Sequence, residues 1–471
     1  MSKYFDLIKD KLKDNFDLKH REIETAGGLI YLIYIDDLCN VSFISEYIVT
    51  PIVENKDIIK SVENLKRGIL RTNSVNDVKD FNDGILHILS GDVLIILENE
   101  EKAIYCEAKG FVKRAIATPQ SENVLKGPRE AFGEAFVDNV SLIRRIIKNP
   151  DLKFESFYIG KKSNTVVVMA YIKDVADESL INKVKEKLEK MDNDFILGSN
   201  YVSEELSSNK KTFFDTVGST EKADIAASRL HEGRVVVIVD GSPFVTSMPH
   251  FFFENFHAPD DYYLNKYYAN FTRILREIAF LVAMFLPGLY LAITTYHFSL
   301  IPSVFVFRLA VSRAGVPFPS VIELFLMIFF FAILRESGIR LPQPIGQAAS
   351  IVGALILGDA AIGAGLASQI GLIIVAVSSI CSFLVPKLYG PIASWSVIII
   401  IFSSLLGLPG FYIILHTFIA HMASLESLGY PYLYPLGTAK DFKFRDILIR
   451  GDLKNISKNI GKDDLNAKKA N

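Results

Sequence analysis

Charged side chains are distributed very unevenly along this chain of 471 residues. Residues 278–439 contain nine Asp, Glu, Lys and Arg side chains in 162 positions, whereas the other 309 positions hold 95. A water-soluble domain of that length needs charged side chains on its surface. The pattern therefore predicts that residues 266–439 form a helical membrane domain.

The apolar runs in this region have the length of membrane-spanning helices, which need about 20 residues to cross roughly 30 Å of hydrocarbon. The run 388–425 carries no charge and would be roughly 57 Å long as one helix, and Gly407-Leu408-Pro409-Gly410 is a natural break within it. We expect about six spans, with four or five as alternatives. The six are 278–296, 319–334, 341–358, 360–386 and the two halves of 388–425.

Basic residues predict how these spans are oriented, because loops rich in Lys and Arg stay in the cytoplasm. The chain starts with a charged stretch that lacks the apolar core of a signal peptide. Residues 440–471 form a basic tail with a net charge of +4. We therefore expect both ends of the chain to be cytoplasmic. Arg308 and Arg313 would then lie outside, in a segment too short to span, which we interpret as a re-entrant or interfacial helix.

The first half of the chain is predicted to begin with a charged segment, residues 1–25, followed by an α/β region that contains an internal repeat. Residues 26–150 and 151–265 each contain a buried strand, an acidic turn, a helix and then a second strand pair. The offsets are similar: 137 residues from Tyr34 to Tyr171, and 142 from Gly91 to Gly233. We predict two related α/β subdomains joined by an amphipathic helix within 127–149, with Val137 on its apolar face. Two unrelated stretches are the alternative.

Composition excludes several classes of function. The net charge of −2 argues against a nucleic-acid-binding protein, which normally has a basic surplus. The three cysteines are far apart and form neither a disulfide framework nor a metal-binding motif. No phosphate-binding loop, HExxH motif or GxSxG elbow occurs. We therefore expect no catalytic residues, no cofactor and no metal, and predict that the protein is not an enzyme.

A few ionisable groups interrupt the apolar region, and such groups are costly in a membrane and often functional. Glu323 lies inside the second predicted span, and Asp359 separates the third from the fourth. Both are candidates for an ion pathway or a gating element, although Asp359 could also belong to an outer loop. Arg335, Glu336 and Arg340 bracket a Ser-Gly turn and are candidate interfacial anchors.

Small residues concentrate beside these groups, with six Gly and seven Ala among residues 341–373. Small side chains let membrane helices approach closely, so this stretch predicts a packing seam. Gly353 and Gly358 are candidates for movement of the packed helices. Gln343 and Gln347, one turn apart, could hydrogen-bond across the seam or face a water path.

Several stretches of this sequence resemble the GerA family of spore germination proteins. The longest is GVPFPSVIELFLMIFFFAILRESGIRLPQPIGQAASIVGALILGDAAIGAGL, and shorter ones are KGPREAFGEAFVDNVSLIRRIIKNPDLKFE, EGRVVVIVDGSPFV and HMASLESLGYPYLYPL. Their order agrees along roughly residues 25–450. The chain departs from the family pattern at Ile328 and Ala332, where members often carry acidic residues.

The resemblance implies a multi-pass protein of the inner spore membrane, in contact with lipid. It implies an A-type subunit of a germinant receptor that works with a transporter-like B subunit, which senses nutrient, and a C-subunit lipoprotein. It further implies a homo-oligomer, expected to be a pentamer, acting as a ligand-gated ion channel. A secondary transporter and a non-conducting membrane scaffold are the rival interpretations. The triggering nutrient is not readable from the residues.

Overall fold

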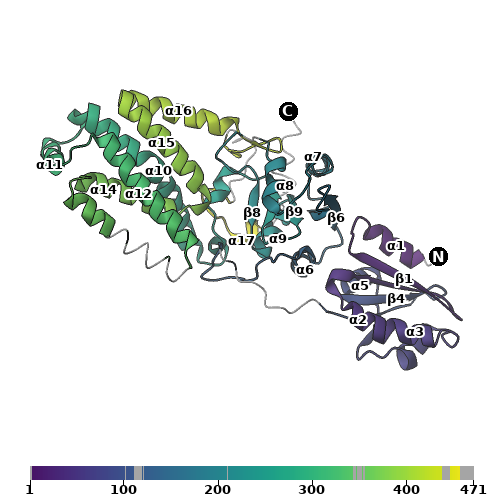
Figure 1. Cartoon of the computed structure of the whole chain (residues 1–471). Helices are drawn as coiled ribbons and strands as arrows, with labels where there is room; N and C mark the ends of the chain where they lie inside the picture. The colour runs from purple at the N-terminus through teal and green to yellow at the C-terminus, as the bar shows by residue number, and fades with distance from the viewer. Residues whose placement is uncertain are drawn as a thin grey trace.

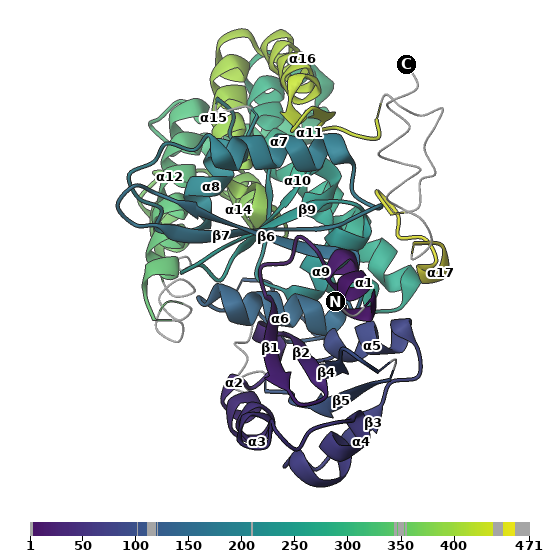
Figure 2. The ribbon, with the colours of Figure 1, turned by 90° about the vertical axis from the view of Figure 1, so that its right-hand side faces the viewer.

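The computed structural model describes residues 3–100, 102–110, 119, 121–208, 211–342, 346, 353, 356–436 and 446–456. Two α/β units and a helical bundle follow one another in a row, with the N-terminal unit farthest from the bundle (Figure 1). Figure 2 views the molecule from the N-terminal unit, so that the bundle lies behind the second unit. The second unit therefore lies between the first unit and the bundle.

The first unit is a five-stranded antiparallel sheet in the order β1-β2-β4-β5-β3. Both of its faces are covered, which explains the unbroken apolar run of β4. α1 and α5 cover one face, and the short helices from α2 to η3 cover the other. The elements are α1 Lys3–Lys11, β1 Leu18–Thr25, β2 Gly28–Ile35, η1 Asp36–Leu38, α2 Val41–Phe43, η2 Ile44–Val49, α3 Thr50–Glu54, α4 Val62–Asn64, η3 Leu65–Ile69, β3 Val75–Asp77, α5 Phe81–Ile88, β4 Asp92–Leu97 and β5 Ala103–Glu107.

The second unit repeats this sheet in the order β6-β7-β9-β10-β8. α7 and α8 pack on one face, and α6 and α9 pack on the other. Every residue of β9 is buried. The elements are α6 Phe136–Ile146, β6 Leu152–Ile159, β7 Thr165–Ile172, α7 Glu178–Glu189, α8 Ser199–Leu206, β8 Gly218–Thr220, α9 Ala223–His231, β9 Val235–Val239 and β10 Val245–Met248.

The register of the central strand pair is the same in the two sheets. Ile30 pairs with Leu97 in the first sheet, and Val167 pairs with Val239 in the second. Val167 lies 137 residues after Ile30 and Val239 lies 142 after Leu97, which are the two offsets seen in the sequence. A one-residue slip would turn every side chain to the opposite face. Equal strand order and equal register support an internal duplication.

The predicted boundaries of the two units need correction at two places. The charged segment 1–25 is not separate, because it contributes α1 and the edge strand β1 to the first sheet. α6 belongs to the second unit, since Val140 and Ile143 are buried against Phe154 and Val168 of that sheet. The helix is also shorter than 127–149, and Val137 is exposed rather than on the buried face.

The bundle begins after two short helices that leave the second sheet. α15 ends at Leu406 and α16 starts at Leu408, so the predicted break is confirmed, and Gly407 turns the chain with a φ of +68°. The elements are η4 Phe252–Phe256, η5 Pro259–Tyr262, α10 Lys266–Tyr296, η6 Phe298–Leu300, α11 Ser303–Arg313, α12 Ser320–Arg340, α14 Gln369–Phe383, η7 Pro386–Leu388, α15 Tyr389–Leu406, α16 Leu408–Ser424, β11 Glu426–Ser427, β12 Tyr430–Pro431 and α17 Leu453–Ile456.

Two details of the predicted spans are wrong. Ser337 and Gly338 are helical, so Arg335, Glu336 and Arg340 lie on the last turns of α12 and not around a turn. Asp359 lies within a helical stretch, 356–363, and the chain turns after it, at 364–368.

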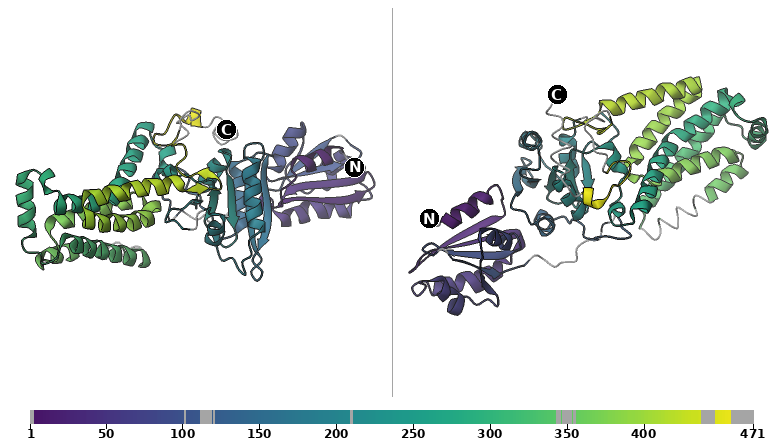
Figure 3. Two further views of the ribbon diagram at one scale, coloured as in Figure 1. Left: turned by 90° about the horizontal axis from the view of Figure 1, so that it is seen from above. Right: turned by 180° about the vertical axis from the view of Figure 1, so that it is seen from behind.

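Lys266–Tyr296 and Pro386–Leu406 are long and apolar enough to cross a membrane, and Gln369–Phe383 and Leu408–Ser424 are shorter apolar helices. The number of spans stays a prediction. α11 lies at the end of the bundle farthest from the α/β units, and the view from above shows it crosswise to the other helices (Figures 1 and 3). The opposite end carries Lys387, whose Nζ is 2.6 Å from Oε1 of Glu122 before the second unit. Arg308 and Arg313, on α11, thus lie at the other end of the bundle from Lys387. Their location outside the membrane stays a prediction.

Candidate functional site

Glu323 is buried between α11, α12 and α14. It lies in the first turn of α12 and is 1% exposed. Its Oε1 accepts hydrogen bonds from Ser368 N at 2.8 Å and Ser368 Oγ at 2.5 Å. Nε of Arg313 on α11 lies 3.9 Å from the other carboxylate oxygen. The carboxylate thus joins three helices, and within one chain it does not face an open surface.

Ser368 is the residue through which α14 meets this carboxylate. It is the N-cap of α14, and its hydroxyl oxygen accepts a hydrogen bond from Gly371 N at 3.0 Å. A Cβ added to Gly371 would collide with Oε1 of Glu323. A side chain at this glycine would therefore displace the carboxylate from Ser368.

The glycines of the predicted seam pack against neighbouring helices. A Cβ on Gly346 would lie 2.5 Å from the carbonyl oxygen of Gly338, and one on Gly353 would lie 2.8 Å from Cδ2 of Leu334. Both contacts are with α12. Gly358 is less tightly placed, since its Cβ would lie 3.6 Å from Leu372.

The remaining predicted site residues are scattered. Asp359 is exposed, and no hydrogen bond or ion pair joins it to Glu323 among the described residues. Gln343 and Gln347 lie outside the described residues. Glu336 and Arg340 are exposed and form an ion pair one turn apart. Arg335 places its guanidinium over the ring of Tyr389, with Cζ 3.0 Å from the ring centroid. The roles assigned to these residues from the sequence stay predictions.

The segment after α16 joins the bundle to the second α/β unit. Leu428 and Tyr430 are buried in the core of that unit, whereas Leu425 and Tyr432 are buried in the core of the bundle. The backbone N–H of Phe252 donates to the carbonyl oxygen of Tyr432 at 2.9 Å. Because one short segment contributes side chains to two cores, a rotation of the unit would move the end of α16.

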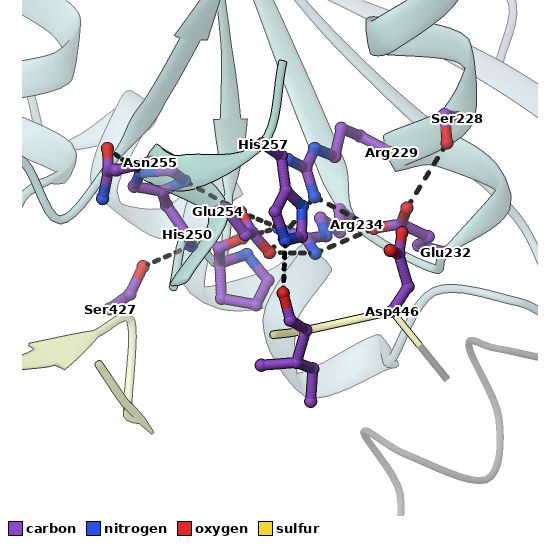
Figure 4. Close-up of polar contacts among 12 residues, drawn as sticks. Ser228, Arg229, Glu232, Arg234, His250, Glu254, Asn255, His257, Ser427 and Asp446 are labelled. Carbon is purple, nitrogen blue, oxygen red and sulfur yellow. Dashed lines mark hydrogen bonds and ion pairs between the residues drawn. The ribbon is translucent and has the colours of Figure 1, made fainter. Parts of the chain in front are cut away.

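A cluster of buried charges lies beside this segment and holds η4 to the sheet (Figure 4). Glu254 is contacted by Nη1 of Arg229 at 3.1 Å and by Nη1 of Arg234 at 2.8 Å, and Nδ1 of His250 lies 2.9 Å from it. Arg234 also contacts Glu232 at 2.8 Å. Burial alone would raise the pKa of Glu254, but the charges of Arg229 and Arg234 hold it well below its usual range. We call Arg229, Glu232, Arg234, His250 and Glu254 the junction cluster.

The C-terminal segment 446–452 binds the start of α10. Asp446 accepts hydrogen bonds from Nη1 of Arg273 and from the hydroxyl of Tyr262, both at 2.6 Å. Arg273 is fully buried and also contacts Asp261 at 3.2 Å. The ring of His257 lies 2.9 Å from the carbonyl oxygen of Ile447. Burial lowers the pKa of His257 to about 4, and the nearby Arg273 acts in the same direction.

An open cleft of about 1180 Å³ lies next to these groups, between the second unit and the start of the bundle. Its lining mixes acidic side chains such as Asp224 and Glu232 with basic ones such as Lys173, Arg229 and Lys387. In the part of the chain that the structure describes, no group of three or more His, Cys, Asp or Glu residues could hold a metal ion.

The two α/β units are also joined by a buried ion pair. Nε of Arg144 on α6 lies 2.5 Å from Oδ2 of Asp17, and its Nη2 lies 2.7 Å from Oδ1. Both side chains are at most 1% exposed. The guanidinium also stacks on Phe154, with Cζ 4.6 Å from the ring centroid.

Sequence reasoning missed the partners of the residues that it selected. Ser368 could have been found as a helix N-cap, because a serine opens the apolar run of α14. The spacing of Arg273 and Arg276 at the edge of the apolar region was a signal for buried ion pairs. Nothing local indicated that Asp446, 173 residues later, would be a partner of Arg273.

Comparisons with known proteins agree along almost the whole chain. A family model described as Bacillus/Clostridium GerA spore germination protein matches residues 6–460. Spore germination protein KA of Bacillus subtilis (strain 168) is 36% identical over 449 residues, covering 94% of this chain and 82% of that protein. Uncharacterized membrane protein YfkQ of the same organism is 33% identical over 438 residues, covering 92% and 85%.

One solved structure is also similar. It is the crystal structure of the N-terminal domain of the A subunit of the Bacillus megaterium spore germinant receptor GerK3. It is 26% identical and covers 53% of this chain and 94% of that chain, with a TM-score of 0.39.

Proposed function

This chain belongs to the GerA family of spore germination proteins, and we propose that it acts as the A-type subunit of a spore germinant receptor. In this proposal it is a multi-pass protein of the inner spore membrane that works with a B subunit and a C-subunit lipoprotein. Several copies form an ion channel that opens when nutrient is sensed. The family match over residues 6–460 is the observation that carries the proposal.

Exposed apolar surface supports the oligomeric part of the proposal. α11 has no buried residue, and α12 exposes Ile322, Phe329 and Ile333 on its outer side. A helix in the interior of a bundle would bury such side chains. Lipid or another copy of the chain would cover them in a channel assembly.

Three features support a gating role for the α/β units. The segment around Leu428 and Tyr432 contributes to both cores, Lys387 is paired with Glu122, and segment 446–452 holds the start of α10. Movement of the second unit would therefore be transmitted to α10, α15 and α16. In this mechanism the contacts of Glu323 with Ser368 and Arg313 hold α11, α12 and α14 together. Gly353, which has no side chain, allows α12 to move past the helix that contains it.

Ion release from spores tests this proposal. Glu323→Gln removes the charge next to Arg313, and Gly353→Leu places a side chain against Leu334. Both should slow nutrient-triggered ion release at normal protein level. Gly363→Leu is the matched control, because a Cβ at Gly363 meets nothing within 4 Å. Unchanged ion release in both test variants would refute the assignment of Glu323 and Gly353 to the gate.

Flux through the reconstituted complex distinguishes the rival functions. Flux through a channel should not saturate as the ion concentration rises. Flux through a secondary transporter should saturate with substrate and show coupled exchange. A scaffold should not conduct ions under any stimulus. Absence of flux in the complete receptor would refute the channel.

A further inference from the structure

Arg335 lies at the end of the bundle nearer the α/β units, where its guanidinium stacks on the ring of Tyr389 and has no carboxylate partner among the described residues. Among the described residues no carboxylate lies within ion-pair distance of its guanidinium, and no hydrogen bond to it is found. The neighbouring Glu336 is engaged by Arg340. A cation in a low-dielectric site needs a counter-charge to offset the lost hydration. The charge of Arg335 is thus available to an anion from outside the chain.

Arg335 lines a cavity of about 60 Å³ between α10, α12, α14 and α15. No acidic side chain lines this cavity in the described residues. Ile328 and Ala332, the two positions at which the chain departs from the family pattern, are among its apolar lining residues. Among the described lining residues the ring of Tyr389 stacks on this guanidinium, but no anionic side chain neutralises its charge.

Serine hydroxyls supply further donors. Ser378, Ser379, Ser382 and Ser396 line the cavity. Ser378 donates to the carbonyl oxygen of Ala283, and Ser382 donates to that of Ser379, both at 2.7 Å. No hydrogen bond of the Ser379 or Ser396 hydroxyl is found among the described residues, so that both can donate to a bound group.

The positive charge and the hydroxyl donors favour an oxyanion, and the size of the cavity limits how much of it can enter. A water molecule occupies about 30 Å³ in the liquid, so the cavity has room for roughly two phosphate oxygens while the rest of the headgroup stays outside it. A phosphate group offers two such oxygens with negative charge, and arginine binds them through two parallel N–H donors. Arg335 stacks on Tyr389, two residues after Lys387, at the end of the bundle that the proposed orientation places at the cytoplasmic headgroups.

We propose that Arg335, Ser379 and Ser396 form a binding site for a phosphate group, supplied by the headgroup of a membrane phospholipid. The proposal rests on the membrane location in the proposed function. Free inorganic phosphate has the same chemistry and is the second source that the experiment must separate.

The test measures lipid bound to the full-length protein, purified in detergent, by native mass spectrometry. Phosphatidylglycerol is compared with a diglucosyl diacylglycerol, which carries no phosphate. The wild type should retain phosphatidylglycerol in preference to the glycolipid. Arg335→Gln should weaken this binding about 10- to 100-fold, as expected for the loss of charge-assisted hydrogen bonds worth about 1.5–3 kcal/mol.

Arg340→Gln is the matched control, since Arg340 is on the same helix, is exposed and is paired with Glu336. It should bind lipid like the wild type. Arg335→Lys keeps the charge but not the paired donors, and should bind with intermediate strength. Ser396→Ala serves as a second variant if Arg335→Gln does not fold, and it should weaken binding several-fold.

Sodium phosphate, compared with sodium chloride at equal ionic strength, separates the two sources. Displacement of the lipid by phosphate would show that the phosphate group alone suffices, and lack of displacement would show that the lipid headgroup is required. Equal binding by Arg335→Gln and the wild type, or equal binding of the glycolipid, would overturn the proposal. Ion flux is read separately, so that failure of the channel proposal leaves this result intact.

Discussion

The contact between Gly371 and Glu323 makes a quantitative prediction about the bundle. Gly371→Ala adds a Cβ that would collide with Oε1 of Glu323 and lie 3.0 Å from Oγ of Ser368. The carboxylate must then leave Ser368 N and Oγ, which donate to it at 2.8 and 2.5 Å. Each hydrogen bond to a charged acceptor is worth about 1.5–3 kcal/mol, and alanine in a helix recovers about 1 kcal/mol over glycine. We expect a net loss of about 3 kcal/mol.

Thermal unfolding of the detergent-purified protein measures this loss. Trp395 is the single tryptophan and is buried against Phe418 in the bundle, so its fluorescence reports on this part of the chain. For domains of 150–250 residues, 3 kcal/mol corresponds to a decrease in Tm of roughly 6–12 °C. Gly363→Ala is the control and should not lower the Tm, because its Cβ meets no atom within 4 Å.

A double variant tests the cause. Glu323→Ala removes the carboxylate that the new Cβ would strike, so adding Gly371→Ala to it should cost little further stability. Equal melting of Gly371→Ala and the wild type would refute the reasoning. Fully additive losses in the double variant would show that the loss has another origin.

Two further predictions concern the α/β region. Arg144→Met leaves Asp17 buried without its partner and should lower the free energy of unfolding by about 3–5 kcal/mol. It should also speed limited proteolysis between the two units, whereas Arg145→Met, at a partly exposed residue, should not. Equal cleavage of the two variants would contradict this role of Arg144. The pKa of His257 lies at about 4 in the folded chain and at 6.5 in the unfolded chain. Between these pH values the unfolded chain therefore binds more protons than the folded chain. The free energy of unfolding should fall by about 2–3 kcal/mol as the pH drops from 7 to 4. The lowered pKa of Glu254 adds a loss only below about pH 4.5. Denaturation series at several pH values measure both effects, and His257→Gln should flatten the curve above pH 4.5; an unchanged slope would exclude His257 as the cause.

Features that depend on neighbouring residues along the chain were predictable. The scarcity of charge in residues 278–439 indicated the helical region, and Gly407 marked the break between α15 and α16. The offsets of 137 and 142 residues indicated the repeat, and the paired strands preserve both. These features follow from backbone preferences and from the burial of apolar side chains, which act locally or repeat with a fixed period.

Features that depend on residues far apart in the chain were decided by the tertiary structure. Glu323 was selected from the sequence, but its burial and its bonds to Ser368, 45 residues later, follow from the packing of α12 against α14. The same holds for Asp446 with Arg273 and for Arg144 with Asp17. A charged residue in a sequence shows only that its charge must be compensated, because the energy of a buried charge depends on what the fold brings within about 4 Å of it. The sequence by itself determined which parts are apolar and repeated, whereas the fold alone determined which charges meet.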